Sequence, residues 1–369
     1  MIVSAEAASR RDSRAQAARA RLLRWYRATA RPLPWRGSPD PYRIWVSEVM
    51  LQQTQVATVI NYYDRFLRAF PTVERLARAR FEKVAACWSG LGYYRRARHL
   101  HLAARKIVEE FGGTFPNTYA AARTLPGVGP YTACAVLSIA YRHPLPVVDG
   151  NVARVVARLN AMQGNIQQRA FRAEVERYLL RMLSERRPGD FNQAMMELGQ
   201  TVCLPRAPRC GACPLRAGCS AFRRGRPESY PQPRPRRAAE PRFLAAAVIS
   251  EGGKVALARG LDEDLLGDLW NFPAAFGPSS EEAIERLRSK MTSSWGAALR
   301  LGRKVAIARH TITYRSIRVE LYEAMGIPRG GQLRWFTAAA FENAAVSQLA
   351  RKIMTAWRER VDAEKPQGV

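Results

Sequence analysis

Four cysteines within one short segment are the residues whose spacing most directly indicates chemistry. Cys203, Cys210, Cys213 and Cys219 are separated by six, two and five residues. One C-x2-C pair with longer arms favours thiolates around a single iron-sulfur cubane, since structural zinc sites usually use two short-spaced ligand pairs. Zinc is the alternative. Disulfides are disfavoured, because six cysteines in 369 residues without a leader suggest an intracellular chain. The expected cofactor is a 4Fe-4S cluster.

Glu48 is a carboxylate in a helical pattern of residues suited to binding. Trp45, Glu48, Gln52 and Gln55 recur at spacings of three and four, which would place a carboxylate, two amides and an aromatic ring on one helix face. A solvated polar face is a reasonable alternative for Gln55 but fits the whole set poorly, given Trp45. The pattern therefore favours a functional role for Glu48.

A glycine-containing turn at residues 125–131 separates two helical runs. Gly127 and Gly129 permit a tight hairpin whose backbone N–H groups can approach a phosphate at a helix start. A glycine-proline turn is commonplace by itself. Asp149 follows about twenty residues later, at the entrance of another predicted helix, where an N-cap aspartate is the ordinary role. Together these features make a helix-hairpin-helix motif followed by a second candidate carboxylate.

The composition indicates a large, strongly basic protein. Net charge +28 and a pI near 10.9 point to a polyanionic partner, because basic residues that neutralise phosphates release counterions. Coding bias and solvated arginine faces are the alternative explanation. No run is apolar enough to span a membrane, and the arginine-rich start reads as an ordinary first helix rather than a transit segment. We expect residence in the bacterial cytoplasm, with the nucleoid.

The elements that must position these residues fall into two domains. Helical spacing dominates up to Cys219 and predicts an all-α domain at residues 1–222. A Pro/Arg-rich stretch at residues 223–242 reads as a linker. Residues 243–369 mix strands and helices and predict an α+β domain, with residues 243–249 and 254–258 paired as a hairpin across Gly252 and Gly253.

Taken together, these motifs resemble the helix-hairpin-helix DNA glycosylases, in the iron-sulfur branch shared by endonuclease III and MutY-type adenine glycosylases. The MutY type is the closer match. Beside the hairpin, Asp149 and the cysteine loop, the resemblance is carried by residues 33–36 (LPWR), 45–56 (WVSEVMLQQTQV) and 90–94 (GLGYY). It implies a base-excision-repair enzyme that removes adenine opposite 8-oxoguanine or guanine in double-stranded DNA.

N-glycosidic cleavage needs an acid for the departing base and a carboxylate that stabilises positive charge on the sugar. Glu48 fits the role of the acid, for which burial would have to raise its pKa, and Asp149 fits the role of the second carboxylate. The resemblance further implies that Tyr131 and Asn151 hold the base and orient the catalytic groups, although each could simply begin or cap a helix. By the same resemblance, Gln53, Leu91 and Tyr93 match the wedge and stacking positions that fill the gap in the duplex. Arg31 and Arg36 resemble the base-pocket and acid-supporting arginines, and Gln193 is a candidate contact to adenine.

Lysine usage separates the two types within this branch. A glycosylase that also nicks the strand needs a nucleophilic lysine, usually just after the hairpin, where this chain has Tyr131. The predicted helical domain contains only Lys83 and Lys106. We therefore expect a monofunctional, monomeric enzyme. An endonuclease III-like enzyme acting on damaged pyrimidines and a non-catalytic iron-sulfur DNA-binding protein are the rival interpretations.

The tail resembles the Nudix-like (MutT-like) module with which this family recognises 8-oxoguanine, most clearly at residues 265–273 (LLGDLWNFP). The metal-binding core of a Nudix box is absent after Pro273, so neither hydrolase activity nor magnesium is expected. At residues 312–314 the chain has Ile-Thr-Tyr where the family more often has Phe-Ser-His. The resemblance then assigns lesion recognition to Thr313, with Tyr314 either stacking or packing as a strand residue.

Overall fold

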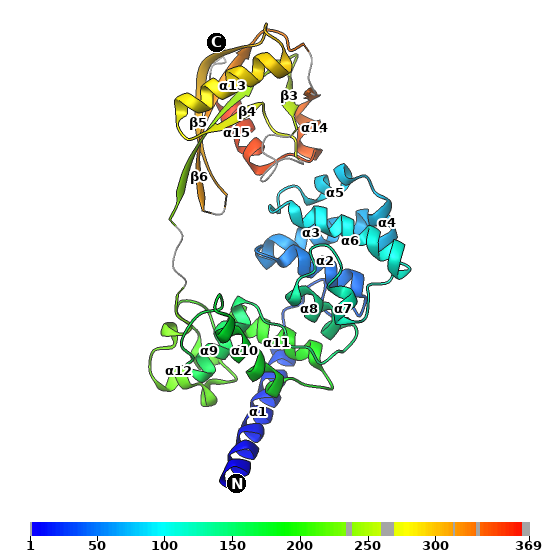
Figure 1. Cartoon of the computed structure of the whole chain (residues 1–369), viewed down its shortest axis with the longest axis vertical. Helices are drawn as coiled ribbons and strands as arrows, with labels where there is room; N and C mark the ends of the chain where they lie inside the picture. Colours follow the sequence, from blue (N-terminus) through cyan, green and yellow to red (C-terminus); the bar gives the residue numbers. More distant parts are fainter. Residues whose placement is uncertain (1, 234–237, 260–268, 313, 330–332, 364–369) are drawn as a thin grey trace, which may run out of the picture. The chain divides into compact units, whose positions relative to one another are not determined.

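A computed structural model describes residues 2–233, 238–259, 269–312, 314–329 and 333–363 (Figure 1). The chain divides into two compact units. The first comprises Met1–Arg78 and Arg98–Pro235, and the second comprises Ala79–Ala97 and Arg236–Val369. Among the described residues, no helix combines the length and apolar character needed to cross a bilayer.

The first unit is helical, as the sequence predicts. Its helices are α1 (Ile2–Thr29), α2 (Pro41–Leu51), α3 (Val56–Ala69), α4 (Val73–Arg78), α6 (Arg95–Phe111), α7 (Tyr119–Ala122), α8 (Pro130–Ala140), α9 (Gly150–Asn160), α10 (Arg169–Met182), α11 (Pro188–Thr201) and α12 (Ser220–Arg223), with short 3-10 turns η1 (Cys210–Ala212), η2 (Arg216–Gly218) and η3 (Pro227–Ser229). The 3-10 turn η3 and the first residues of a strand at Glu240 lie inside the stretch predicted as a linker.

Two packing arrangements in this unit set up the site. Helices α1, α9, α10 and α11 share an apolar core that includes Leu22, Val156, Val175 and Leu198, all fully or almost fully buried. Helix α2 packs against α3 and α8. The start of α8, the start of α9 and one side of α11 are thereby held near α2, the helix that carries Glu48.

The second unit contains two sheets and the helices around them. The strands are β1 (Glu240–Val248), β2 (Ser250–Glu251), β3 (Lys254–Ala258), β4 (Ala274–Gly277), β5 (Arg300–Ile312), β6 (Arg315–Met325) and β7 (Leu333–Phe336), and the helices are α5 (Phe81–Trp88), α13 (Ser280–Trp295), α14 (Ala338–Asn343) and α15 (Gln348–Ala363). One sheet has the order β4-β1-β6-β5, with β1 and β6 parallel, and the other has the order β2-β3-β7.

Helices α13 and α15 cover opposite faces of the larger sheet (Figure 1). Because alternate side chains of a strand point to opposite faces, β1 contributes Leu244 and Ala246 to the core beneath α15, and Ala245 and Ala247 to the core beneath α13. The α+β prediction is confirmed for this unit.

The predicted hairpin pairing was wrong in one respect. Gly252 and Gly253 both have positive φ and form the expected turn, but the strand before it is β2, which pairs Glu251 with Lys254. The preceding strand β1 belongs to the other sheet. The chain passes from one sheet to the other at Ile249, whose carbonyl accepts from the Ala256 N–H at 2.9 Å. Residues 243–248 pair in the other sheet and do not contribute to the hairpin.

Candidate active site

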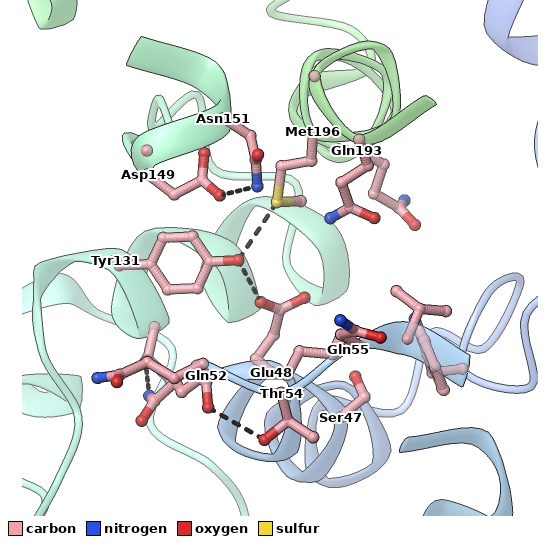
Figure 2. Close-up of a pocket in the computed structure, with 18 of the residues that line it drawn as sticks. Ser47, Glu48, Gln52, Thr54, Gln55, Tyr131, Asp149, Asn151, Gln193 and Met196 are labelled. Carbon is pink, nitrogen blue, oxygen red and sulfur yellow. Dashed lines mark hydrogen bonds between the residues drawn. The ribbon is translucent and has the colours of Figure 1, made fainter. Parts of the chain in front are cut away.

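A cleft in the first unit gathers most of the polar residues that the sequence singles out. Its volume is about 1000 Å³, and its walls come from α2, the turn after α2, the hairpin before α8, the start of α9 and α11 (Figure 2). The predicted residues that line it are Arg31, Arg36, Glu48, Gln53, Gly127, Gly129, Tyr131, Asp149, Asn151 and Gln193.

Glu48 lies at the centre of this cleft with a carboxylate that is difficult to ionise. The residue is only 4% exposed, and its Oε2 accepts a hydrogen bond of 2.7 Å from the Tyr131 hydroxyl (Figure 2). Burial raises the pKa of Glu48 to about 7. The hydrogen bond from Tyr131 lowers this pKa but is the smaller effect, and the charge of Asp149 raises it further. Glu48 can therefore hold or release a proton near neutral pH.

The predicted face around Glu48 is only partly formed. Trp45 does not line the cleft but is 1% exposed in the core, where its ring centroid lies 5.7 Å from that of Phe115. Helix α2 is buried on almost every side, so its apolar residues point in several directions. The helix ends at Leu51, and Gln52 and Gln55 reach the cleft from the turn that follows.

Asp149 is both the N-cap of α9 and part of a polar network. Its Oδ1 accepts from the Val152 N–H at 2.7 Å, and its Oδ2 accepts from Asn151 Nδ2 at 2.9 Å. Arg154 donates to Asn151 Oδ1 at 2.9 Å and to the Gly199 carbonyl at 2.8 Å. Burial raises the pKa of Asp149 although these bonds oppose it. The capping role and a functional role are therefore compatible.

The glycine turn has the predicted form. Gly127 has φ +75°, and a Cβ atom there would lie 2.7 Å from the Cβ of His99. A side chain at this position would therefore strain the backbone and clash with His99. Gly129 has φ −80° and caps α8. The Val128 carbonyl accepts from Arg123 Nη1 at 2.6 Å. The hairpin thus delivers Tyr131, in the first turn of α8, into the cleft.

Two of the remaining predicted residues belong to the second unit. Leu91 is 5% exposed, and its carbonyl accepts from Arg96 Nη2 at 3.2 Å. Tyr93 is 45% exposed, has φ +48° and lies under the Arg96 guanidinium, 5.5 Å from its ring centroid. Arg96 therefore fixes the backbone and the ring of this short loop, which is held in a strained left-handed conformation.

Sequence reasoning missed a buried carboxylate on α11. Glu197 is 1% exposed and binds Arg31 through two hydrogen bonds of 2.6 and 2.7 Å, and Arg36 through one of 2.6 Å. Burial alone would raise its pKa, but the hydrogen bonds and charges of the two arginines lower it. A glutamate inside the apolar pattern of α11 was the available indication, because a carboxylate buried there needs a cationic partner.

The four cysteines of the loop lie around one small cavity. Cys203, Cys210, Cys213 and Cys219 line a common small cavity together with Arg158. Arg158 donates from Nη1 to Cys203 Sγ at 3.4 Å, and its carbonyl accepts from Cys219 Sγ at 3.3 Å. None of the four forms a disulfide. Within the described residues, no group of three or more His, Cys, Asp or Glu side chains is arranged around a single metal ion.

The residues predicted to read the lesion are only partly described. Thr313 and residues 260–268 lie outside the described residues. In the rest of the LLGDLWNFP segment, Leu269 and Phe272 are buried in the core, and the Asn271 N–H and carbonyl form an isolated bridge with Ala258. Tyr314 lies beside Arg315, whose guanidinium is 5.6 Å from its ring centroid.

Comparison with known proteins agrees with both halves of this description. Residues 46–180 match the family model of the HhH-GPD superfamily base excision DNA repair proteins, and residues 244–356 match that of the NUDIX domain. The chain is 35% identical to the adenine DNA glycosylase of Mus musculus, over 92% of this chain and 78% of the mouse protein. It is 34% identical to that of Homo sapiens, over 92% of this chain and 74% of the human protein.

Among solved structures, a thermostable thymine-DNA glycosylase superposes with a TM-score of 0.52 at 27% identity, covering 57% of this chain and 98% of that one. This likeness supports the helical fold of the first unit. The identity to the curated relatives extends through both family-model regions. The chain therefore belongs to the adenine DNA glycosylases, enzymes of base excision repair.

Proposed function

We propose that this glycosylase hydrolyses the N-glycosidic bond of adenine mispaired with 8-oxoguanine or guanine, and does not cut the strand. The observation that carries the proposal is the environment of Glu48. Burial raises the pKa of this carboxyl group to about 7. It is hydrogen-bonded to Tyr131 inside a cleft that also contains Asp149. An acid that is partly protonated at neutral pH can protonate a departing purine.

Departure of adenine leaves positive charge on the sugar, and Asp149 is the carboxylate suited to stabilise it. Its two oxygens are held by the Val152 N–H and by Asn151, which Arg154 anchors in turn. This fixed orientation means that little reorganisation is needed as the charge develops. Glu48, once it has given up its proton, can then assist the attack of water on the sugar.

The set of groups in the cleft favours hydrolysis over a Schiff-base mechanism. Tyr131 stands just after the hairpin, and none of the described residues that line the cleft is a lysine. Lys106 pairs with Glu110 on α6 at 3.5 Å. Without an amine nucleophile, the product would be an intact strand with an abasic site.

Binding of duplex DNA would use the basic surface and the hairpin. The N–H groups around Gly127 and Gly129 are suited to a phosphate, and Gln53, Leu91 and Tyr93 are our candidates for filling the gap left by the flipped base. Gln193, Arg31 and Arg36 are candidates for contacts to adenine. We further propose that the second unit reads 8-oxoguanine, with Thr313 as the contacting residue.

We infer that Cys203, Cys210, Cys213 and Cys219 hold a 4Fe-4S cluster. Four free thiols that line one cavity suit a cluster in which each iron takes one thiolate. The cluster would cross-link the loop and supply no step of the reaction. Arg206, Arg209 and Arg216, between or beside the ligands, would then face the DNA backbone.

The test uses duplexes with adenine opposite 8-oxoguanine, guanine or thymine, labelled on the adenine strand. After incubation with enzyme, each sample is divided and half is heated with alkali. Breaks that appear only after alkali, and only opposite 8-oxoguanine and guanine, are expected. Absence of adenine-strand breaks in both halves would refute adenine removal, and breaks without alkali, or a complex trapped by borohydride, would indicate an endonuclease III-like lyase.

A further inference from the structure

The segment that carries Leu91 and Tyr93 comes from the middle of the helical region but belongs to the second unit. Residues 79–97 form one compact unit with residues 236–369, the tail of the chain. Apolar packing joins the two parts, because Ala85 of α5 is 1% exposed and lies in the core beneath α15. Two candidates for filling the gap in the duplex are therefore built onto the same unit that we propose reads 8-oxoguanine.

The main-chain carbonyl of Val346 is the point at which this loop is bonded to the tail. Val346 is fully buried, and its carbonyl accepts from the Ser89 hydroxyl at 3.3 Å and from the Tyr94 hydroxyl at 3.1 Å. The Ser89 hydroxyl in turn accepts from Arg351 Nη2 of α15 at 3.1 Å. Val346 also forms an isolated parallel bridge with Trp270 of the LLGDLWNFP segment. Both ends of the loop are thus bonded to one carbonyl of the tail.

The Tyr94 hydroxyl has a second role inside the loop. It accepts from the Gly90 N–H at 3.2 Å, which closes the turn between these two residues. A hydroxyl can donate one hydrogen bond while it accepts another, so the same group also bonds to the tail. Arg96 Nη2 donates to the carbonyls of Leu91 and Gly92 at 3.2 and 3.1 Å. Arg96 therefore fixes the shape of the loop, whereas Tyr94 joins that shape to the tail.

We propose that Tyr94 is a positioning residue that sets specificity: its hydroxyl couples the loop that fills the gap in the duplex to the unit that reads the opposite base. Guanine lacks the C8 oxygen and the N7–H of 8-oxoguanine, so it offers the tail fewer contacts. Contacts that the tail makes only with the lesion then favour insertion of Leu91 and Tyr93. The inference rests on the proposed function, namely adenine removal with the second unit as the reader of 8-oxoguanine.

The test compares single-turnover adenine release from duplexes with adenine opposite 8-oxoguanine and opposite guanine. Tyr94→Phe keeps the ring and removes only the hydroxyl. We expect the ratio of the two rates to fall by at least about fivefold, because release opposite 8-oxoguanine slows more. Ser89→Ala removes the weaker bond to the same carbonyl and should lower the ratio by a smaller factor. Tyr42→Phe is the matched control, since it removes a 2.7 Å bond from a buried tyrosine to the Phe70 carbonyl in the first unit, and it should leave the ratio unchanged.

A second measurement follows the loop without base release. The fluorescence of a 2-aminopurine placed beside the target adenine rises when the bases around it unstack. On mixing with the 8-oxoguanine duplex, this rise should be slower in Tyr94→Phe than in wild type, by a factor similar to the loss in release rate. With the guanine duplex, the two proteins should differ less.

Equal slowing of Tyr94→Phe with both duplexes would overturn the inference and leave Tyr94 a structural residue, and an unchanged ratio at unchanged rates would overturn it as well. If Tyr94→Phe does not fold, Ser89→Ala decides, and an unchanged ratio in that variant contradicts the inference. Failure of the wild-type enzyme to release adenine from either duplex would refute the proposed function instead. The fluorescence comparison needs no base release and would still decide whether Tyr94 couples the loop to the tail.

Discussion

The hydroxyl of Tyr131 donates a 2.7 Å hydrogen bond to Oε2 of Glu48. This bond favours the ionised carboxylate, whereas burial disfavours it, and burial is the larger effect. The pKa of Glu48, about 7, is therefore a balance between a desolvated site and one well-placed donor. Each member of that balance can be removed separately.

Tyr131→Phe removes the donor and leaves the ring. Because the lost bond lowered the pKa of Glu48, the midpoint of the pH–rate profile should move above its wild-type value near pH 7. The rate at lower pH should fall by about tenfold to a hundredfold, since the acid is less well oriented. Single-turnover rates across pH measure both effects. Tyr119→Phe, an exposed tyrosine on α7, is the control, and a downward shift in Tyr131→Phe would contradict this account.

Glu48→Gln should stabilise the protein in a pH-dependent way. Folding raises the pKa of Glu48 from 4.5 to about 7, so the folded state binds more protons than the unfolded state between these values. The wild-type free energy of unfolding therefore falls as pH rises through this window. Relative to wild type, the variant should gain on the order of 3 kcal/mol at a pH of about 8 and little near pH 4.5. Urea unfolding at both pH values measures it, and a gain independent of pH would argue against a buried, proton-binding Glu48.

Gly127→Ala and Gly129→Ala form a matched pair in the hairpin. Gly127 has φ +75° and no room for a Cβ beside His99, so its variant should lose about 2 kcal/mol of stability. Gly129 has φ −80° and nothing within 4 Å of an added Cβ, so its variant should unfold like the wild type. Thermal unfolding compares them. Equal stability of the two variants would mean that the turn is not held as described.

Replacement of any one of the four loop cysteines should cause loss of the proposed 4Fe-4S cluster. Serine at Cys203, Cys210, Cys213 or Cys219 should lower bound iron and inorganic sulfide, measured with the visible absorbance of the purified protein. Serine at Cys87 or Cys134, which do not line the loop cavity, is the control and should retain both. Zinc in place of iron in the wild-type protein would contradict the cluster assignment.

The sequence was most informative where chemistry and local conformation depend on the same few residues. Asp149 is followed immediately by a helix, and Gly127 needs a positive φ, so the local sequence is enough to place both of them. The prediction for Glu48 rested partly on a wrong grouping, because Trp45 belongs to the core and not to the face that carries Glu48. Helical spacing identifies neighbours on a surface, but it cannot say which side is covered when almost the whole helix is buried.

The Glu197 pairing could not be found in this way. Its arginine partners, Arg31 and Arg36, are more than 160 residues away in the chain, so the contact depends on the tertiary packing of α11. The passage of the chain from one sheet to the other just before Gly252 is likewise a non-local choice. Local patterns predict elements and turns, whereas pairings over such separations require the fold.

The account depends most on Glu48 as the acid that releases adenine. The direct measurement is single-turnover adenine release from an adenine:8-oxoguanine duplex by wild type and Glu48→Gln, alongside the Kd of each for the same duplex. We expect release to fall by at least about a hundredfold, while Kd stays within about threefold. Release by Glu48→Gln at a rate close to wild type would contradict the central claim, as would a loss of DNA binding as large as the loss of activity.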